Sequence, residues 1–370
     1  MSNTLSGLDR LSRRAERGNV PLSVQFEITG RCNLDCQHCY LDIKKPPPEM
    51  STETIFGILD QLAAAGTFFL AITGGEVFLR KDLFQILRHA RGLGFAVRLF
   101  TSGTRMTRAH AKEIATLGLV AVEMSLYGAK CDVHDTITRR PGSHRKTIRA
   151  ALMLRRLGVP VVLKSPVFAG TAGGHRDFMK LAERVGAHGK LDPSIMIRRN
   201  GDPAPTHLRS SANELAVVLR DLLDIKPGDP LPPPADPDSA PCAIGRRTAR
   251  IGPEGNVYPC STYPTHVGNL NETSFAKIWF GDSPLLARLR AVKFSDFGPT
   301  CTGCAKSGYC SRCLAMAVIE HGDERAPVAQ ACRIAEGREI AAGVVDAMPA
   351  PGLVAARERN AGRRSLPLVG

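Results

Sequence analysis

Gly30-Arg31-Cys32-Asn33-Leu34-Asp35-Cys36-Gln37-His38-Cys39-Tyr40 is the part of the sequence that says most about this chain. Its three cysteines have the spacing C-x3-C-x2-C and come directly after an alternating apolar run at residues 24–29. Thiolates this close together favour a metal cluster, and cysteine thiolates are the usual ligands of a 4Fe–4S cube. Three thiolates leave one of the four irons open to a small molecule. The alternatives are three buried free thiols and a three-thiolate zinc site.

A second motif, Gly74-Gly75-Glu76, follows the apolar run at residues 67–73. Such a run predicts a parallel strand that is covered on both faces, and ligand sites of barrel-like α/β folds collect at the carboxyl ends of strands. Two glycines let backbone groups come close to a ligand, and Glu76 offers a negative charge to an ammonium group. The tripeptide alone would indicate a turn, but its place one βα unit beyond the cysteines predicts a ligand contact.

Strand and helix patterns alternate along the first part of the chain. Strands are expected at residues 23–28, 67–73, 95–100, 119–126, 159–165 and 190–197. Helical patterns fall at residues 51–65, 82–92, 107–117, 143–157, 175–185 and 211–224. This alternation predicts an α/β fold of parallel βαβ units. Right-handed crossovers allow either a six-stranded partial barrel or a doubly wound sheet.

Seven further cysteines gather in the last third of the chain. They are Cys242, Cys260, Cys301, Cys304, Cys310, Cys313 and Cys332. Residues 250–258 predict a hairpin with its turn at 252–256. Paired C-x2-C motifs can form zinc knuckles, but the five residues between Cys304 and Cys310 are fewer than a zinc ribbon usually has.

Together these motifs resemble the radical S-adenosylmethionine (SAM) superfamily with a SPASM extension, and the resemblance spans about residues 22–340. It implies a partial (β/α)6 radical SAM barrel followed by a small cysteine-rich SPASM domain with a β-hairpin and helices. It also implies an enzyme that reductively cleaves SAM to a 5′-deoxyadenosyl radical, which abstracts hydrogen from a substrate.

The same resemblance implies roles for individual residues. Cys32, Cys36 and Cys39 would bind the 4Fe–4S cluster whose open iron holds SAM, and His38 is the ring just before the third cysteine. The implied SAM contacts are Gly74, Gly75, Glu76, Ser125 for the ribose, and Arg139 or its neighbour Arg140 for the carboxylate.

Two auxiliary Fe–S clusters are implied for the SPASM domain. Cys242, Cys260 and Cys313 would serve the first cluster; the second would take Cys301, Cys304, Cys310 and Cys332. Two cubes with full cysteine ligation need eight thiolates, so we expect one iron of the first cluster to lack a protein thiolate. The segment Cys310-x2-Cys313 departs from the family, which usually has three residues there, and Cys131 is expected to be an ordinary free thiol.

Composition limits the remaining choices. The chain has 370 residues, eleven cysteines and a net charge of +14. No apolar run approaches the roughly 18 residues of a membrane span, and the Arg-rich N-terminus does not resemble a signal peptide. These features favour the cytoplasm. The expected segments are a basic lead-in at 1–21, the barrel at 22–225, a Pro-rich linker at 226–241, the SPASM domain at 242–346 and a disordered tail at 347–370.

The preferred function is radical SAM chemistry on a peptide or protein side chain. A tetrapyrrole side chain is the alternative substrate, and a zinc-dependent nucleic-acid-binding protein is the alternative of another class. The basic surface favours an acidic electron donor, a flavodoxin or ferredoxin. No peptide-recognition module precedes the first strand, so either a separate leader-peptide-binding protein or none is expected. Neither a membrane nor a nucleic acid is expected as a partner.

Overall fold

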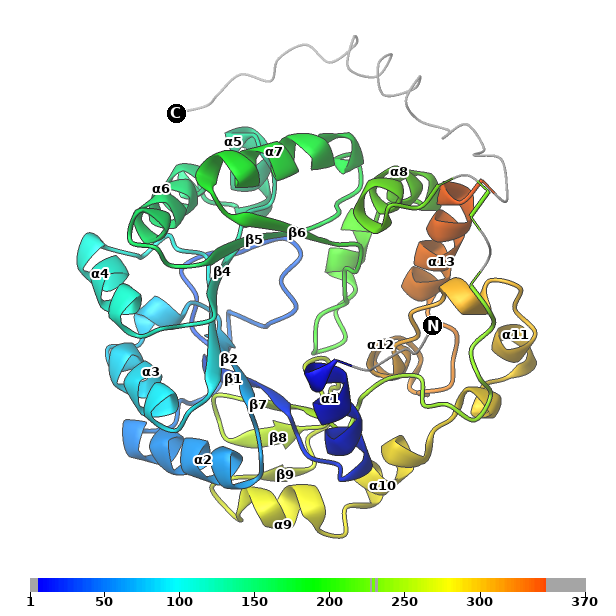
Figure 1. Cartoon of the computed structure of the whole chain (residues 1–370), viewed down its shortest axis with the longest axis horizontal. Coiled ribbons are helices and arrows are strands. Elements are labelled where there is room, and N and C mark those ends of the chain that lie inside the picture. Colours follow the sequence, from blue (N-terminus) through cyan, green and yellow to red (C-terminus); the bar gives the residue numbers. More distant parts are fainter. Residues whose placement is uncertain (1–5, 227, 230–231, 344–370) are drawn as a thin grey trace.

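The computed structural model describes residues 6–226, 228–229 and 232–343, and its strands form one continuous sheet (Figure 1). The strand order is β6-β5-β4-β3-β2-β1-β7-β8-β9. Six neighbouring strands are parallel: β1 (Ser23–Thr29), β2 (Phe69–Gly74), β3 (Ala96–Thr101), β4 (Ala121–Ser125), β5 (Val161–Pro166) and β6 (His188–Asp192). The expected partial barrel is therefore confirmed. The expected tail at 347–370 lies outside the described residues.

Helices connect the parallel strands and cover their outer face. They are α2 (Thr52–Ala64), α3 (Leu83–Gly92), α4 (Arg108–Thr116), α5 (Cys131–Thr138), α6 (Ser143–Arg156) and α7 (His175–Val185), with α8 (Ala212–Leu223) after β6. The sixth strand is shorter than the expected 190–197, because Pro193 follows Asp192 and has no N–H to continue the ladder.

The two faces of the parallel sheet differ in chemistry. Alternate residues such as Phe26, Leu99 and Leu163 are fully buried in the main apolar core under the helices. Their neighbours on the opposite face include Glu27, Arg98, Glu123 and Lys164. Glu123 pairs with both Arg98 and Lys164, and Glu27 pairs with Arg199. The barrel interior is therefore lined with paired charges.

The cysteine-rich region completes the sheet at one edge. β7 (Thr248–Ile251) pairs in parallel with β1, and β8 (Asn256–Tyr258) pairs antiparallel with β7, which confirms the expected hairpin. β9 (Gly268–Asn269) follows β8, and the remaining helices are α9 (Phe275–Phe280), α10 (Pro284–Ala291), α11 (Pro299–Thr302), α12 (Leu314–His321) and α13 (Ala329–Ala341).

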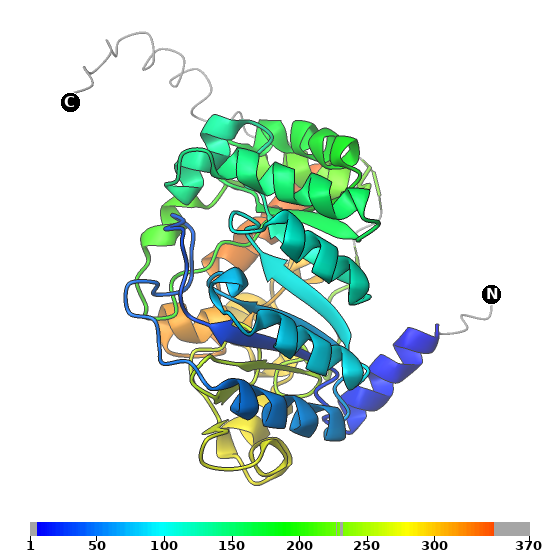
Figure 2. The same ribbon diagram turned by 90° about the vertical axis from the view of Figure 1, so that its left-hand side faces the viewer.

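The last helix reaches the other edge of the barrel. Ile334 of α13 packs into an apolar cluster with Leu215, Val218 and Leu219 of α8. The C-terminal region thus fills the open side of the barrel between β1 and α8, as Figure 1 shows. Figure 2 shows α1 (Gly7–Arg17) at one end of the barrel and the loop after β1 at the other. Among the described helices none is long and apolar enough to cross a membrane.

Candidate functional site

The loop after β1, residues 30–50, carries the first three cysteines and is called the cluster loop below. Cys32, Cys36 and Cys39 are partly buried and close enough to influence one another's ionisation. Burial raises the pKa of Cys32 to about 11 and also raises the pKa values of Cys36 and Cys39. Positive charge from bound iron is what would favour thiolates here.

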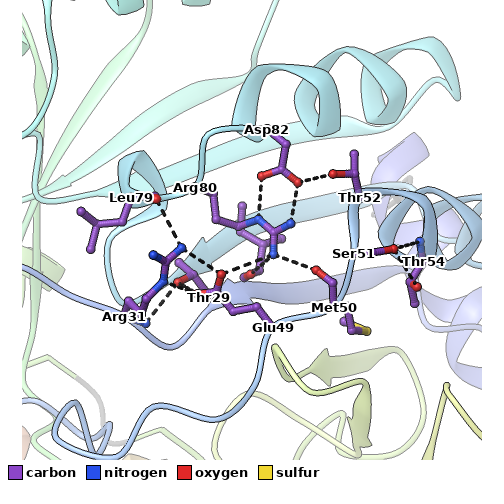
Figure 3. A network of polar contacts seen from close by, with 11 residues as sticks. Thr29, Arg31, Glu49, Met50, Ser51, Thr52, Thr54, Leu79, Arg80 and Asp82 are labelled. Atoms are coloured by element: carbon purple, nitrogen blue, oxygen red, sulfur yellow. Dashed lines mark hydrogen bonds and ion pairs between the residues drawn. The ribbon is translucent and has the colours of Figure 1, made fainter.

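Two arginines fix both ends of the cluster loop (Figure 3). Arg31 forms a two-pronged ion pair with Glu49, with Nε–Oε1 at 2.8 Å and Nη2–Oε2 at 2.9 Å. Arg80 donates from Nη1 to the carbonyl of Ile28, just before the loop, at 3.0 Å. The same nitrogen donates to the carbonyl of Met50, the last residue of the loop, at 3.1 Å. The cysteines therefore lie on a loop whose two ends are both held in place by side-chain hydrogen bonds.

Gly74 and Gly75 allow this loop to cross the end of β2. The N–H of Gly75 donates to the carbonyl of Thr29 at 2.9 Å, and the N–H of Glu76 donates to the carbonyl of Arg31 at 2.8 Å. A Cβ atom at Gly75 would lie 2.2 Å from the Arg31 oxygen. The backbone that approaches these glycines is thus the cluster loop itself.

Glu76 is fully buried and joins β2 to the end of β3. Its Oε1 accepts from Thr101 Oγ1 at 2.5 Å, and its Oε2 accepts from the N–H of Ser102 at 3.0 Å and from the Ser102 hydroxyl. The chain of bonds continues through Thr104 to Asn33 Nδ2, 3.0 Å away, in the cluster loop. The N–H of Phe78 also donates to Oε1 at 3.3 Å, so four donors occupy the roughly four acceptor positions of this carboxylate.

An aromatic group lies behind the cluster loop. The ring of His38 meets Tyr127 and Phe168 edge to face, at centroid distances of 4.4 and 5.2 Å. Burial lowers the pKa of His38 to about 4, so its ring is neutral at pH 7. Ser125 and Cys36 lie close enough to the Tyr127 side chain to influence its ionisation. Sequence reasoning missed Tyr127, although its place just beyond a strand end, two residues after Ser125, was a signal.

Arg139 lies beside the cluster loop, on its exposed side. It has a left-handed backbone with φ of 52° at the end of α5, and its Nη1 lies 3.0 Å from Asp35 Oδ2. Both side chains of this pair are about half exposed, at 52% and 45%. Cys131, at the start of α5, is exposed and stands apart from the other cysteines.

The structure brings the seven later cysteines together in two groups. Cys301, Cys304, Cys310 and Cys332 line one cavity of about 820 Å³. Cys242, Cys260 and Cys313 influence one another's ionisation and pack against an apolar cluster that includes Ile244, Tyr263 and Leu314. Burial raises the pKa of Cys260 to about 12.

These groups suit clusters better than single ions. In the described residues, no three His, Cys, Asp or Glu side chains converge as they would around one metal ion. Thiols distributed around a cavity fit a group of several irons, whereas zinc needs all its sulfurs about 2.3 Å from one point.

The acidic residues before Cys242 do not join the three-cysteine group. Asp236 lines the cavity of the other four cysteines, and Asp238 forms an ion pair with Lys293 at 2.9 Å.

A smaller cavity of about 290 Å³ lies beside Gly30, between the cluster loop and the C-terminal hairpin. Its wall includes Glu27, which pairs with Arg199 at 2.7 Å and with Arg250 at 3.0 Å. Arg250 also stacks on Tyr258, 3.4 Å from the ring centroid. Glu27, Arg199 and Arg250 were not identified from sequence, because three distant segments contribute them.

Comparison with known proteins agrees with this arrangement. Residues 26–183 match the model of the radical SAM superfamily, and residues 242–313 match SPASM, an iron–sulfur cluster-binding domain. The chain is 32% identical over 308 residues to mycofactocin maturase MftC of Mycobacterium tuberculosis. The aligned region covers 77% of this chain and 77% of the relative. It is 25% identical over 356 residues to an AdoMet-dependent heme synthase of Oleidesulfovibrio alaskensis, which covers 87% of this chain and 90% of the relative.

Solved structures share the fold at low sequence identity. Streptococcus suis SuiB bound to S-adenosylmethionine has a TM-score of 0.69 and 15% identity, covering 89% of this chain and 84% of SuiB. SuiB bound to its precursor peptide SuiA has a TM-score of 0.67 and 13% identity, covering 88% and 81%.

Proposed function

Because this chain belongs to the radical SAM superfamily and carries a SPASM domain, we propose that it modifies a side chain of a peptide or protein substrate. It is an iron–sulfur enzyme that uses S-adenosylmethionine, and it has auxiliary clusters in addition to the SAM-binding cluster. Family membership replaces the alternative of a zinc-dependent nucleic-acid-binding protein.

The proposed ligands follow the grouping of the thiols. Cys32, Cys36 and Cys39 would hold the SAM cluster on the cluster loop, and the two later groups of cysteines would hold the auxiliary clusters. The proposed SAM contacts are His38, Gly74, Gly75, Glu76, Ser125 and Arg139. Bound there, the cluster and SAM supply the radical that removes a hydrogen atom from the substrate.

The cavity beside Gly30 is the observation that carries the peptide proposal. Its volume of about 290 Å³ suits one or two amino-acid side chains, since pockets for drug-sized ligands span about 300–1,000 Å³. A whole tetrapyrrole macrocycle is itself a drug-sized ligand and needs a pocket within that range. The wall of Arg199, Arg250 and Tyr258 would position a polar side chain next to the cluster loop.

A tetrapyrrole side chain remains the second candidate substrate, because the similarity to AdoMet-dependent heme synthase covers most of both chains. For partners, we propose an acidic flavodoxin or ferredoxin as electron donor and a separate leader-peptide-binding protein. The cytoplasm is the proposed compartment.

The test uses the full chain with its clusters reconstituted anaerobically. With SAM and dithionite, the wild type should form 5′-deoxyadenosine, and the triple variant Cys32→Ala/Cys36→Ala/Cys39→Ala should not. Short peptides encoded beside the gene should speed this reaction and lose one hydrogen to deoxyadenosine, as mass spectrometry of deuterated peptides would show. Undiminished deoxyadenosine in the triple variant would refute the cluster assignment. Acceleration by an iron tetrapyrrole and by no peptide would establish the second candidate.

A further inference from the structure

Arg312 is a buried cation whose carboxylate partner is missing from the described part of the chain. It lies between Cys310 and Cys313, and 8% of its surface is exposed. No ion pair with a carboxylate is formed by its guanidinium among residues 6–226, 228–229 and 232–343. Burying an unpaired charge is costly, so an anion is expected beside it.

Three neighbours fix the direction of the Arg312 side chain. Nη2 donates to the carbonyl oxygens of Arg325 and Ala326, at 2.5 and 2.8 Å. The guanidinium lies over the ring of Phe297, 3.7 Å from its centroid. Arginine is well suited to such a site because its planar fork presents several donors in a rigid arrangement.

Another donor of Arg312 points at a cysteine sulfur. Nη1 of Arg312 lies 2.5 Å from Sγ of Cys301, in the wall of the 820 Å³ cavity that four cysteines share. With iron bound, the thiolates of this group would supply the anion that Arg312 lacks.

We propose that Arg312 raises the reduction potential of the auxiliary cluster that Cys301, Cys304, Cys310 and Cys332 would hold. The proposal rests on the ligand assignment made above. One electron from the reductant adds one negative charge to the cluster, and a guanidinium hydrogen-bonded to its ligand sulfur stabilises that charge. Net charge and hydrogen bonds to the sulfurs are among the factors that set such potentials. Arg312 stays protonated throughout, so the electron is taken up without a proton from this residue.

Lys306 provides a matched control in the same cavity. It also lines the cavity, but its Nζ lies 3.5 Å from Glu339 and its side chain is 40% exposed. Its charge is therefore largely compensated and screened by water. Removing it should move the potential much less than removing the charge of Arg312.

The experiment measures potentials in the full chain. The background is Cys32→Ala/Cys36→Ala/Cys39→Ala, which removes the SAM cluster, and the auxiliary signals are followed by electron paramagnetic resonance in a dithionite titration. Arg312→Met should lower the reduction potential of the cluster. At a fixed solution potential the ratio of reduced to oxidised cluster should fall at least tenfold, which corresponds to a shift of about 59 mV for one electron. Only one auxiliary signal should shift. Arg312→Lys, which keeps the charge, should shift less, and Lys306→Met should leave the potential near that of the background.

Several results would overturn the proposal. An unchanged potential in Arg312→Met would do so, and so would an equal shift of both signals or an equal shift in Lys306→Met. If the Arg312→Met variant fails to hold the cluster, the cluster potentials of Arg312→Gln and Arg312→Lys are compared instead. Equal potentials in these two variants would contradict the proposal. If Cys301→Ala and Cys332→Ala leave both auxiliary signals unaltered, the ligand assignment itself is wrong, and the proposal falls with it.

Discussion

Glu76 is fully buried at the end of β2 and accepts hydrogen bonds on both carboxylate oxygens from the end of β3. At the scale of single residues, these bonds orient the carboxylate. Its negative charge would still attract an ammonium group, which would share or replace one of the four donors that Glu76 now has.

The substitution Glu76→Gln tests whether this carboxylate holds the SAM ammonium. It removes a charge-assisted hydrogen bond worth about 1.5–3 kcal/mol. The affinity for SAM should therefore fall by roughly ten- to a hundredfold. Equilibrium binding of SAM to the reconstituted protein measures this affinity.

Ser102→Ala is the matched control for Glu76→Gln. It removes one hydroxyl donor to Glu76 and leaves the carboxylate charge in place. Its SAM affinity should change by less than that of the Gln variant. If Glu76→Gln binds SAM as tightly as the wild type, the role of Glu76 is limited to joining β2 to β3.

Sequence patterns identified single residues where the motif is local. Cys32, Cys36 and Cys39 are close together in the sequence, and the structure places all three on one loop. Arg199 could not be found in this way, because its partner Glu27 is 172 positions away. Two residues so far apart in the sequence do not form a motif that can be recognised from spacing.

At the scale of elements, the crossing of the cluster loop over β2 depends on Gly75. An alanine Cβ there would meet the Arg31 oxygen at 2.2 Å and Cys32 Cβ at 3.0 Å. Gly75→Ala should therefore displace the loop and reduce the iron content of the SAM cluster, with a matching loss of 5′-deoxyadenosine. Iron analysis and absorbance near 400 nm measure this.

Gly92→Ala is the control for that substitution. Gly92 lies in α3, and no atom lies within 4 Å of its added Cβ. Alanine is favoured over glycine in a helix by roughly 0.5–1 kcal/mol, so iron content should be unchanged. Equal iron content in Gly75→Ala and the wild type would mean that the loop tolerates the displacement.

Most elements were predictable because their signals are local. Apolar periodicity located the six parallel strands and most of their helices, and the turn at 252–256 located the hairpin. The exception is α5, which has no counterpart among the expected helices. The pairing of β7 with β1 was not predicted, since apolar alternation identifies the buried face of a strand but not its neighbour.

At the scale of the whole molecule, a buried ion triad joins three distant segments. Glu27 of β1 pairs with Arg250 of β7 and with Arg199 beyond β6, and 2–3% of Glu27 and Arg250 is exposed. Glu27→Gln would leave two guanidinium groups without a carboxylate. Breaking such a pair costs about 3–5 kcal/mol, which guanidinium chloride unfolding monitored by fluorescence of the single tryptophan, Trp279, would measure.

The pH dependence of the same pair gives a second measurement. Burial raises the pKa of Glu27, but Arg199 and Arg250 outweigh it, so the pKa lies below its usual 4.5. The difference in unfolding free energy between wild type and Glu27→Gln should be constant above about pH 4.5. It should shrink as the pH falls through the lowered pKa. The control Arg88→Met breaks an exposed pair, with side chains 55% and 36% exposed, and should cost less than about 1 kcal/mol.

The net charge of +14 predicts how the electron donor approaches. Opposite charge speeds the encounter of two proteins, and salt weakens this effect because the Debye length falls to about 3 Å at 1 M. Reduction by an acidic flavodoxin or ferredoxin should therefore slow steeply as salt rises. Stopped-flow absorbance measures the rate, and a rate independent of salt would contradict this role of the basic surface.

The parallel pairing of β1 with β7 also has a consequence for biosynthesis. β1 is among the first elements to leave the ribosome, but the strand that covers its outer edge emerges only after the entire barrel. Until then the edge of β1 offers unpaired N–H and C=O groups, which invite pairing with other chains. A nascent chain that stops before residue 248 should consequently need chaperone protection. Loading of iron onto the neighbouring cysteines would then best follow release of the completed polypeptide.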